Sequence, residues 1–197
     1  MGTVRFGRII KLLFIISILY FLIYFIPQGF RLLYPLHFED IIHKYSKEYQ
    51  IEAPMIAAVI KTESNFFTFA ESPKGARGLM QITPSTGKWI ADKLKVENYS
   101  DESLYEPEIN IRFGCWYIRH LHEYFGNDMR LVLAAYNGGR GNVDKWLKDS
   151  SLSEDGKTLD VIPFKETDEF IKRVKRNYNI YTRLYNWSNI TEDGDTK

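Results

Sequence analysis

The amino-acid sequence predicts an all-α protein. Apolar residues recur three and four positions apart along most of the chain, the pattern of helices that bury one face. We find no convincing alternation of apolar and polar residues, so at most a small hairpin is expected. The 197 residues suffice for one domain with a real core and an N-terminal appendage.

The appendage is an apolar segment, residues 9–26, which carries no charge after Lys11. Its length is near the short end of what a membrane-spanning helix needs. Arg5 and Arg8 precede it, and no acidic residue occurs before Glu39. The positive-inside rule therefore predicts a cytoplasmic N-terminus and a chain that continues outside the membrane.

A cleavable signal peptide is the main alternative, because a basic start and an apolar middle fit it as well. However, the apolar segment ends Phe-Ile-Pro-Gln-Gly-Phe, without the small-x-small pattern of a cleavage site. We favour an uncleaved signal anchor in residues 1–30. A domain in residues 31–190 and a frayed tail in residues 191–197 would follow.

Charge and cysteine usage exclude several functions. The formal net charge is +1, and without the three basic residues of the anchor it is −2, with 23 basic and 25 acidic residues left. No basic run indicates nucleic acid, and near-neutrality does not indicate electrostatic capture of an anionic polymer. The single Cys115 can form neither an internal disulfide nor a Cys-His metal cluster, and is expected to be buried. His120 and His122 lie two apart and cannot share a helix face, so no metal or cofactor is expected.

Helices are predicted in order along the domain. After a juxtamembrane stretch at residues 27–37, helices are expected where apolar stripes coincide with start and stop signals such as Thr83-Pro84, Pro107, Asp128 and Gly138-Gly139. The expected ranges are 38–49, 54–63, 84–94, 107–125, 129–136, 142–148 and 166–185. In residues 107–125 the aromatic-rich stripe is expected to be core: Ile109, Phe113, Trp116, Tyr117, Leu121 and Tyr124.

The helix expected from Pro54 places Glu63 near its C-terminal end. Pro54 suits a first helical position, and the apolar stripe behind it predicts burial. A carboxylate there is desolvated and faces the negative end of the helix dipole, and both effects raise its pKa. A raised pKa is what a general acid needs at neutral pH. The alternative is an exposed, inert Glu, which is the usual state of a lone carboxylate.

Five motifs follow one another along the chain: Glu63-Ser64, the loop Ser72-Pro73-Lys74-Gly75-Ala76, the run Gly78-Leu79-Met80-Gln81, the triplet Ala135-Tyr136-Asn137, and Pro163-Phe164-Lys165-Glu166-Thr167. In this order they resemble the soluble lytic transglycosylase family, which shares the goose-type lysozyme core. The resemblance covers roughly residues 38–185. It implies a lysozyme-like helical domain behind one N-terminal transmembrane helix.

The resemblance also implies roles for the residues of these motifs. Glu63 would be the catalytic acid and base, and the Tyr136 hydroxyl would point at it. The implied substrate-binding residues are Ser64, Ser72, Gln81, Tyr136, Asn137 and Glu166. Four positions depart from the family pattern: Thr83 stands where Met is frequent, Gly138 and Arg140 replace a usual Ala and Pro, and Phe170 replaces a common Tyr.

The leading hypothesis is a peptidoglycan lytic transglycosylase, anchored in the cell membrane with its catalytic domain on the extracytoplasmic side. It would cleave the β-1,4 bond between N-acetylmuramic acid and N-acetylglucosamine and form 1,6-anhydro ends. A lysozyme-type hydrolase of the same bond is one alternative; it needs a second carboxylate to activate water. A catalytically silent glycan-binding domain is another, although such a module needs no buried acid.

Overall fold

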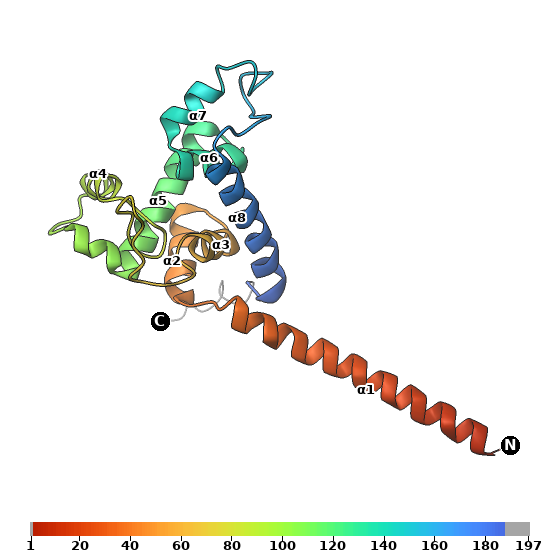
Figure 1. The fold of residues 1–197 in the computed structure, drawn as a ribbon. Helices are drawn as coiled ribbons and strands as arrows, with labels where there is room; N and C mark the ends of the chain where they lie inside the picture. The colour runs from red at the N-terminus through yellow and green to blue at the C-terminus, as the bar shows by residue number, and fades with distance from the viewer. Residues whose placement is uncertain (1, 188–197) are drawn as a thin grey trace. The chain divides into compact units, whose positions relative to one another are not determined.

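The computed structural model describes residues 2–187, with side chains from Ile10 onwards. The tail expected at residues 191–197 lies outside these described residues. The chain divides into two compact units, Met1–Leu36 and His37–Lys197 (Figure 1). Each unit is described separately below.

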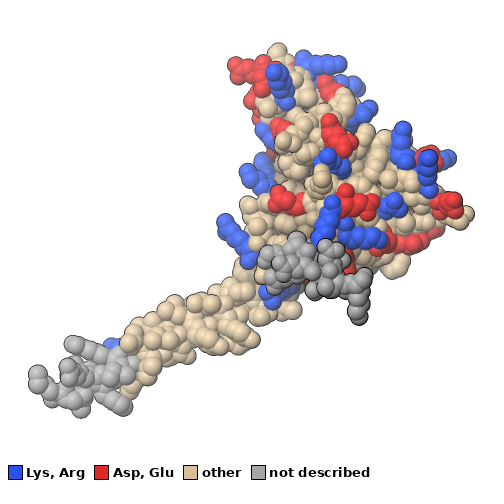
Figure 2. Space-filling model, turned by 180° about the vertical axis from the view of Figure 1, so that it is seen from behind, with Lys and Arg blue, Asp and Glu red and all other residues tan. Residues whose placement is uncertain are grey.

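The first unit is one long helix, α1 (Gly2–Leu33). Its segment Ile10–Leu33 is long and apolar enough to cross a membrane, by length and composition. Figure 2 shows it almost without charged side chains, whereas acidic and basic residues mix over the second unit. The juxtamembrane stretch expected from Pro27 is wrong in part, because the helix continues through this proline. Proline removes one backbone N–H, but the ladder resumes after it, and Tyr34 N–H still bonds Phe30 at 2.8 Å.

The second unit confirms an all-α fold. Its elements are α2 (Glu39–Tyr49), α3 (Ala53–Glu63), α4 (Pro84–Leu94), the 3₁₀ turn η1 (Asp101–Tyr105), α5 (Pro107–Phe125), α6 (Met129–Gly138), α7 (Arg140–Trp146) and α8 (Lys165–Leu184). In place of strands, residues 37–187 contain isolated bridges that join Arg77 to Glu71 and to Ile82. Three expectations are inexact: η1 lies in a stretch expected to be loop, α6 runs to Gly138 rather than to residue 136, and α7 spans Arg140–Trp146 rather than 142–148.

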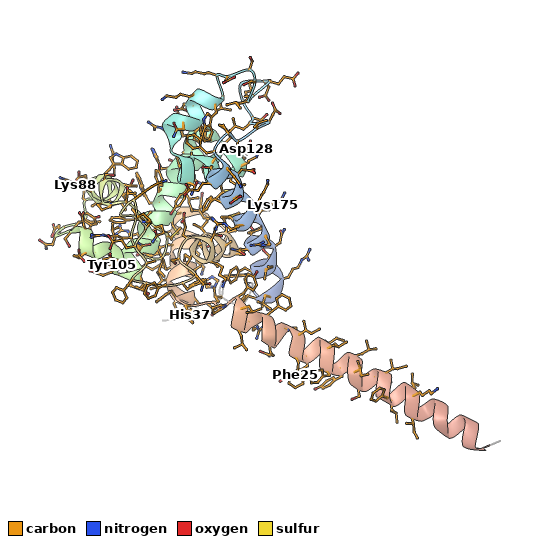
Figure 3. The ribbon with its side chains drawn as sticks, viewed as in Figure 1. Phe25, His37, Lys88, Tyr105, Asp128 and Lys175 are labelled. Atoms are coloured by element: carbon orange, nitrogen blue, oxygen red, sulfur yellow. The ribbon has the colours of Figure 1, made fainter. Side chains whose placement is uncertain are left out.

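The predicted start signals operate as side-chain caps. Thr83 Oγ1 accepts the N–H of Thr86 at 3.3 Å at the start of α4. Asp128, labelled in Figure 3, accepts the N–H groups of Arg130 and Leu131 at the start of α6. These bonds satisfy donors that the first turn of a helix leaves unpaired, which is why both starts were readable from the sequence.

Helix α3 forms the centre of the core. It packs against α2 on one side and against α8 along its length (Figure 1). Its residues from Ile56 to Ile60 have no exposed surface. Small and branched side chains therefore bring neighbouring helices close to the helix that ends in Glu63.

The buried face of α5 differs from the expected one. Phe113 and Leu121 are buried as predicted, but Tyr124 is 53% exposed and Trp116 and Tyr117 are only partly buried. The face that turns inward instead carries Asn110, Ile111, Gly114, Cys115 and Ile118. An apolar count overlooks Asn110 and Gly114, yet both are buried because the segment before α4 lies directly against them. The expected burial of Cys115 is confirmed.

Asn110 fastens the segment between α3 and α4. Its Oδ1 accepts the N–H of Met80 at 2.7 Å, and its Nδ2 donates to Arg77 O at 2.9 Å and Leu104 O at 2.6 Å. Gly78 lies against the same amide with φ +75°, and a Cβ there would come within 2.2 Å of Leu104 O. The close approach requires glycine at residue 78 and a small amide at residue 110.

We expect Asn110→Ala to lower the free energy of unfolding by at least about 2–3 kcal/mol, because three buried backbone groups lose their partner. Denaturant titration of the purified chain measures this. The matched control is Asn127→Ala, an exposed Asn between α5 and α6, which should stay within about 0.5 kcal/mol of the wild type. Equal stability of the two variants would contradict the fastening role.

Candidate active site

A cavity of about 390 Å³ collects most of the predicted site residues. It is lined by Glu63, Ser72, Pro73, Lys74, Ala76, Gln81, Tyr136, Asn137 and Glu166. Four parts of the chain meet there: the end of α3, the loop before α4, the end of α6 and the start of α8. Ser64 does not line the cavity. Volume alone does not distinguish it, since a cavity of about 360 Å³ lies beside Trp89; the buried carboxyl group of Glu63 does.

Glu63 is held as a neutral acid. Its pKa is raised from 4.5 to about 8, chiefly by desolvation. The negative charge of Glu166 adds to the rise, and the positive charge of Arg173 opposes it. The residue keeps some exposure toward the cavity while the surrounding atoms exclude water from its carboxyl group. At neutral pH the side chain therefore carries a proton that it can give to a bound group.

The backbone leaves α3 abruptly after Glu63. Asn65 and Phe66 both adopt positive φ, 52° and 63°, which costs energy in residues other than glycine. Phe66 is buried, and its ring lies 5.7 Å from that of His37, the first residue of the second unit (Figure 3). Burial of this aromatic ring stabilises the strained turn, which leaves Glu63 as the last helical residue.

Ser64 has a structural position. Its hydroxyl donates to Leu79 O at 2.8 Å and lies 3.2 Å from Ile60 O. It thus ties the end of α3 to the Gly-Leu-Met-Gln run. Ser64 therefore does not contact the cavity, and its bond to Leu79 O helps to position the neighbouring Glu63.

Tyr136 differs from what the resemblance implied. Its hydroxyl donates its only proton to Met80 O at 2.6 Å, so it is not the donor to Glu63. The pKa of Tyr136 is nevertheless raised well above 10, first by burial and next by the charge of Glu63, so the two groups are neighbours. Tyr136 therefore lies beside the acid and holds the backbone of Met80, the residue before Gln81.

The polar side chains of the cavity each bond the scaffold through one atom and keep another for a ligand. Gln81 Nε2 donates to Ala70 O and Gly78 O, which leaves its Oε1 as an acceptor. Ser72 Oγ accepts the N–H of Ala76 and keeps its proton. Asn137 Oδ1 accepts from Thr167 at 2.8 Å, which leaves its NH₂ group as a donor. The wall thus offers one acceptor and two donors around a neutral acid.

Glu166 stands at the outer edge of the cavity. It is exposed, and its carboxylate lies 3.5 Å from Lys74 Nζ. Sequence reasoning missed four residues that shape the site: Lys74, Asn110, Thr167 and Arg173. For Arg173 a signal was available, since it follows Glu166 by seven residues and so shares its helix face. The others act through contacts between distant parts of the chain.

The fold and site together define a lysozyme-like all-α domain with a neutral acid in a polar cavity. The family model described as "Transglycosylase SLT domain" matches residues 40–158. The chain belongs to this family. It is 34% identical over 154 residues to the soluble lytic murein transglycosylase of Escherichia coli strain K12, covering 77% of this chain and 24% of that protein.

Two further relatives agree with this assignment. The membrane-bound lytic murein transglycosylase C of Serratia proteamaculans is 35% identical over 127 residues, covering 56% of this chain and 36% of that protein. The crystal structure of an inactive Glu-to-Gln mutant of lytic transglycosylase Slt from Pseudomonas aeruginosa superposes with a TM-score of 0.69 and 29% identity. It covers 80% of this chain and 27% of that one. The chain thus spans only about a quarter to a third of the length of these relatives.

The raised pKa of Glu63 predicts a cost in stability. Between about pH 4.5 and 8 the folded chain holds a proton that the unfolded chain has released, so stability falls as pH rises through this window. We expect Glu63→Gln to exceed the wild type in stability by a margin that grows from pH 5 to pH 8.5, on the order of 4 kcal/mol at most. Thermal unfolding across this range measures it. The control Glu97→Gln, at an exposed carboxylate, should show a constant margin; a constant margin for Glu63→Gln would contradict its burial as an acid.

Proposed function

We propose that this chain is a murein lytic transglycosylase. It cleaves the β-1,4 bond between N-acetylmuramic acid and N-acetylglucosamine and leaves 1,6-anhydro ends on the muramyl residue. The observation that carries the proposal is the neutral Glu63 at the wall of a polar cavity, in a chain of the SLT family. The printed names of the relatives point to the same activity.

Glu63 serves the reaction twice. As an acid it gives its proton to the glycosidic oxygen, and the bond from C1 to that oxygen breaks as the N-acetylglucosamine side leaves as an alcohol. The N-acetyl group of the muramyl residue stabilises the positive charge at C1. Glu63, now a carboxylate, takes the proton of the C6 hydroxyl, and O6 bonds to C1. No water is consumed, and Glu63 ends protonated as it began.

The remaining polar atoms of the cavity suit an N-acetylated sugar. Gln81 Oε1 accepts from a hydroxyl or an acetamido N–H, while Ser72 and Asn137 donate to carbonyl or hydroxyl oxygens. These groups are held by their second bonds to the backbone or to Thr167 and need little reordering on binding.

A hydrolase is the second candidate, because Glu166 brings another carboxylate to the cavity. A water activated there would replace the C6 hydroxyl as nucleophile. Glu166 is exposed and paired with Lys74, which suits a binding role better than a base role. A silent binding domain is disfavoured, because a neutral buried acid lowers stability at neutral pH and serves no purpose in a module that only binds.

We also propose that α1 anchors the catalytic unit as an uncleaved single-pass helix, with that unit on the extracytoplasmic side. The apolar segment Ile10–Leu33 and the basic residues before it support this topology. Murein lies on that side of the membrane, so the topology and the proposed substrate agree.

We expect purified murein digested by the full chain in detergent to give muropeptides lighter by one water than hydrolysis products, as measured by mass spectrometry. Glu63→Gln should reduce the rate by at least roughly 10²–10⁴ without loss of folding. The control Glu97→Gln should keep wild-type activity. Products of full hydrolytic mass would favour the hydrolase, and near-wild-type lysis by folded Glu63→Gln would refute the role of the acid.

For the anchor, the chain expressed in cells should sediment with membranes, resist salt and carbonate extraction, and be cut by external protease after the wall is removed. A variant that starts at residue 34 should lose membrane attachment. A soluble exported form without residues 1 to about 30 would show instead that the segment is a cleaved signal peptide.

A further inference from the structure

Arg173 lies on the face of α8 that borders the active site. Glu166, Phe170, Arg173 and Asn177 follow one another at spacings of four, three and four, so they form one stripe along the helix. The neighbours of this stripe are known on both sides of Arg173. Glu166 pairs with Lys74 at 3.5 Å, and the ring of Phe170 stacks on Tyr136 at 6.3 Å.

The other end of the stripe fixes the position further. Asn177 Nδ2 donates to Thr62 Oγ1 at 2.9 Å, and Thr62 immediately precedes Glu63. Arg173 is one turn before Asn177 and therefore lies beside the last turn of α3. The lowering effect of its charge on the pKa of Glu63 agrees with this placement. Lys175, on the outer side of α8, lies on the opposite face (Figure 3).

The charges of the site do not balance around Arg173. Its side chain is exposed, and within residues 2–187 it makes no ion pair. Lys74 and Glu166 offset each other, and Glu63 is neutral at pH 7 because its pKa is about 8. Glu63, Lys74, Glu166 and Arg173 together therefore carry one positive charge, on the exposed side chain of Arg173. Glu169, one turn before Arg173 on α8, pairs with Lys165 at 3.8 Å.

We propose that Arg173 binds a carboxylate carried on the lactyl arm of a muramyl residue, and so favours murein over uncharged glycans such as chitin. The inference rests on the proposed function. A guanidinium matches a carboxylate with two parallel hydrogen bonds, and the lactyl arm is the group that distinguishes the two sugars of murein. Two sources supply such a carboxylate: the peptide stem, or the lactyl group itself in strands whose stems have been removed.

Binding of this carboxylate also acts on Glu63. A bound anion offsets the charge of Arg173, which otherwise lowers the pKa of the acid. In the complex the pKa of Glu63 therefore rises, and its proton is kept until the glycosidic oxygen takes it. Glu166 still raises the pKa of Glu63 in the complex, while the bound carboxylate offsets the lowering effect of Arg173.

The test measures binding apart from turnover. In full-length chain carrying Glu63→Gln, affinities are measured for three soluble ligands: a disaccharide muropeptide with its stem, the same disaccharide with a free lactyl carboxylate, and a chitooligosaccharide. Adding Arg173→Gln should weaken binding of one or both muramyl ligands about three- to tenfold and leave the chitooligosaccharide unchanged. Arg173→Lys should restore part of the loss. The control Arg176→Gln, an exposed Arg on the same helix, should change none of the three.

The pattern of losses identifies the source. Loss for the stem-bearing ligand alone assigns the carboxylate to the peptide, and loss for the stem-free ligand alone assigns it to the lactyl group. Equal losses for all three ligands, or none, would overturn the proposal. In the chain with Glu63 intact, kcat on murein should fall at a higher pH than kcat/KM does, because kcat reports the complex, in which the pKa of Glu63 is higher. Arg173→Gln should remove this difference between the two pH profiles. A chain that cleaves no murein would refute the proposed function, whereas cleavage that does not depend on Arg173 would refute this inference alone.

Discussion

The active site depends on four consecutive residues whose backbone is held by side chains from three helices. Leu79 O accepts from Ser64 at the end of α3, and Met80 N–H is held by Asn110 of α5. Met80 O accepts from Tyr136 of α6. Gly78 permits the approach, and Gln81, which ends the run, turns its amide into the cavity. Because Ser64 adjoins Glu63, these hydrogen bonds hold both the acid and Gln81. We call residues 78–81 and the three side chains that hold them the frame of the site.

This frame is needed because the site itself is destabilising. Asn65, Phe66 and Gln81 adopt positive φ without being glycine, and Glu63 is held where its anion is poorly solvated. Each of these features would relax if its surroundings were loose. The buried hydrogen bonds of the frame and the packing of α3 against α8 offset these costs. They also keep the acid in one environment, and a single environment is what gives it a defined pKa.

The sequence predicts the parts of this arrangement that depend on local rules. Thr83, Pro107 and Asp128 mark helix starts because a cap or a proline acts on its own turn, and α4 and α5 have the expected bounds. Contacts between distant segments were not predictable. Asn110 reads as a surface amide, yet its partners Met80 and Arg77 lie 30 and 33 residues earlier. That contact turns a different face of α5 toward the core than the apolar pattern predicts. Ser64 and Tyr136 were placed at the site by resemblance, but their hydroxyls bond backbone carbonyls whose positions only the folded chain defines.

The proposed reaction sets two opposite demands on Glu63, since it must hold a proton before bond cleavage and accept one after it. Burial alone would raise the pKa of Glu63 further, and the acid would then give its proton less readily to the glycosidic oxygen. Arg173 moderates this, because its charge opposes desolvation and the charge of Glu166. The value of about 8 is thus the balance of burial against a nearby cation, close enough to neutrality for both steps. A cation at the border of the site, rather than inside it, can have its charge offset by a substrate carboxylate without disturbing the packing around the acid.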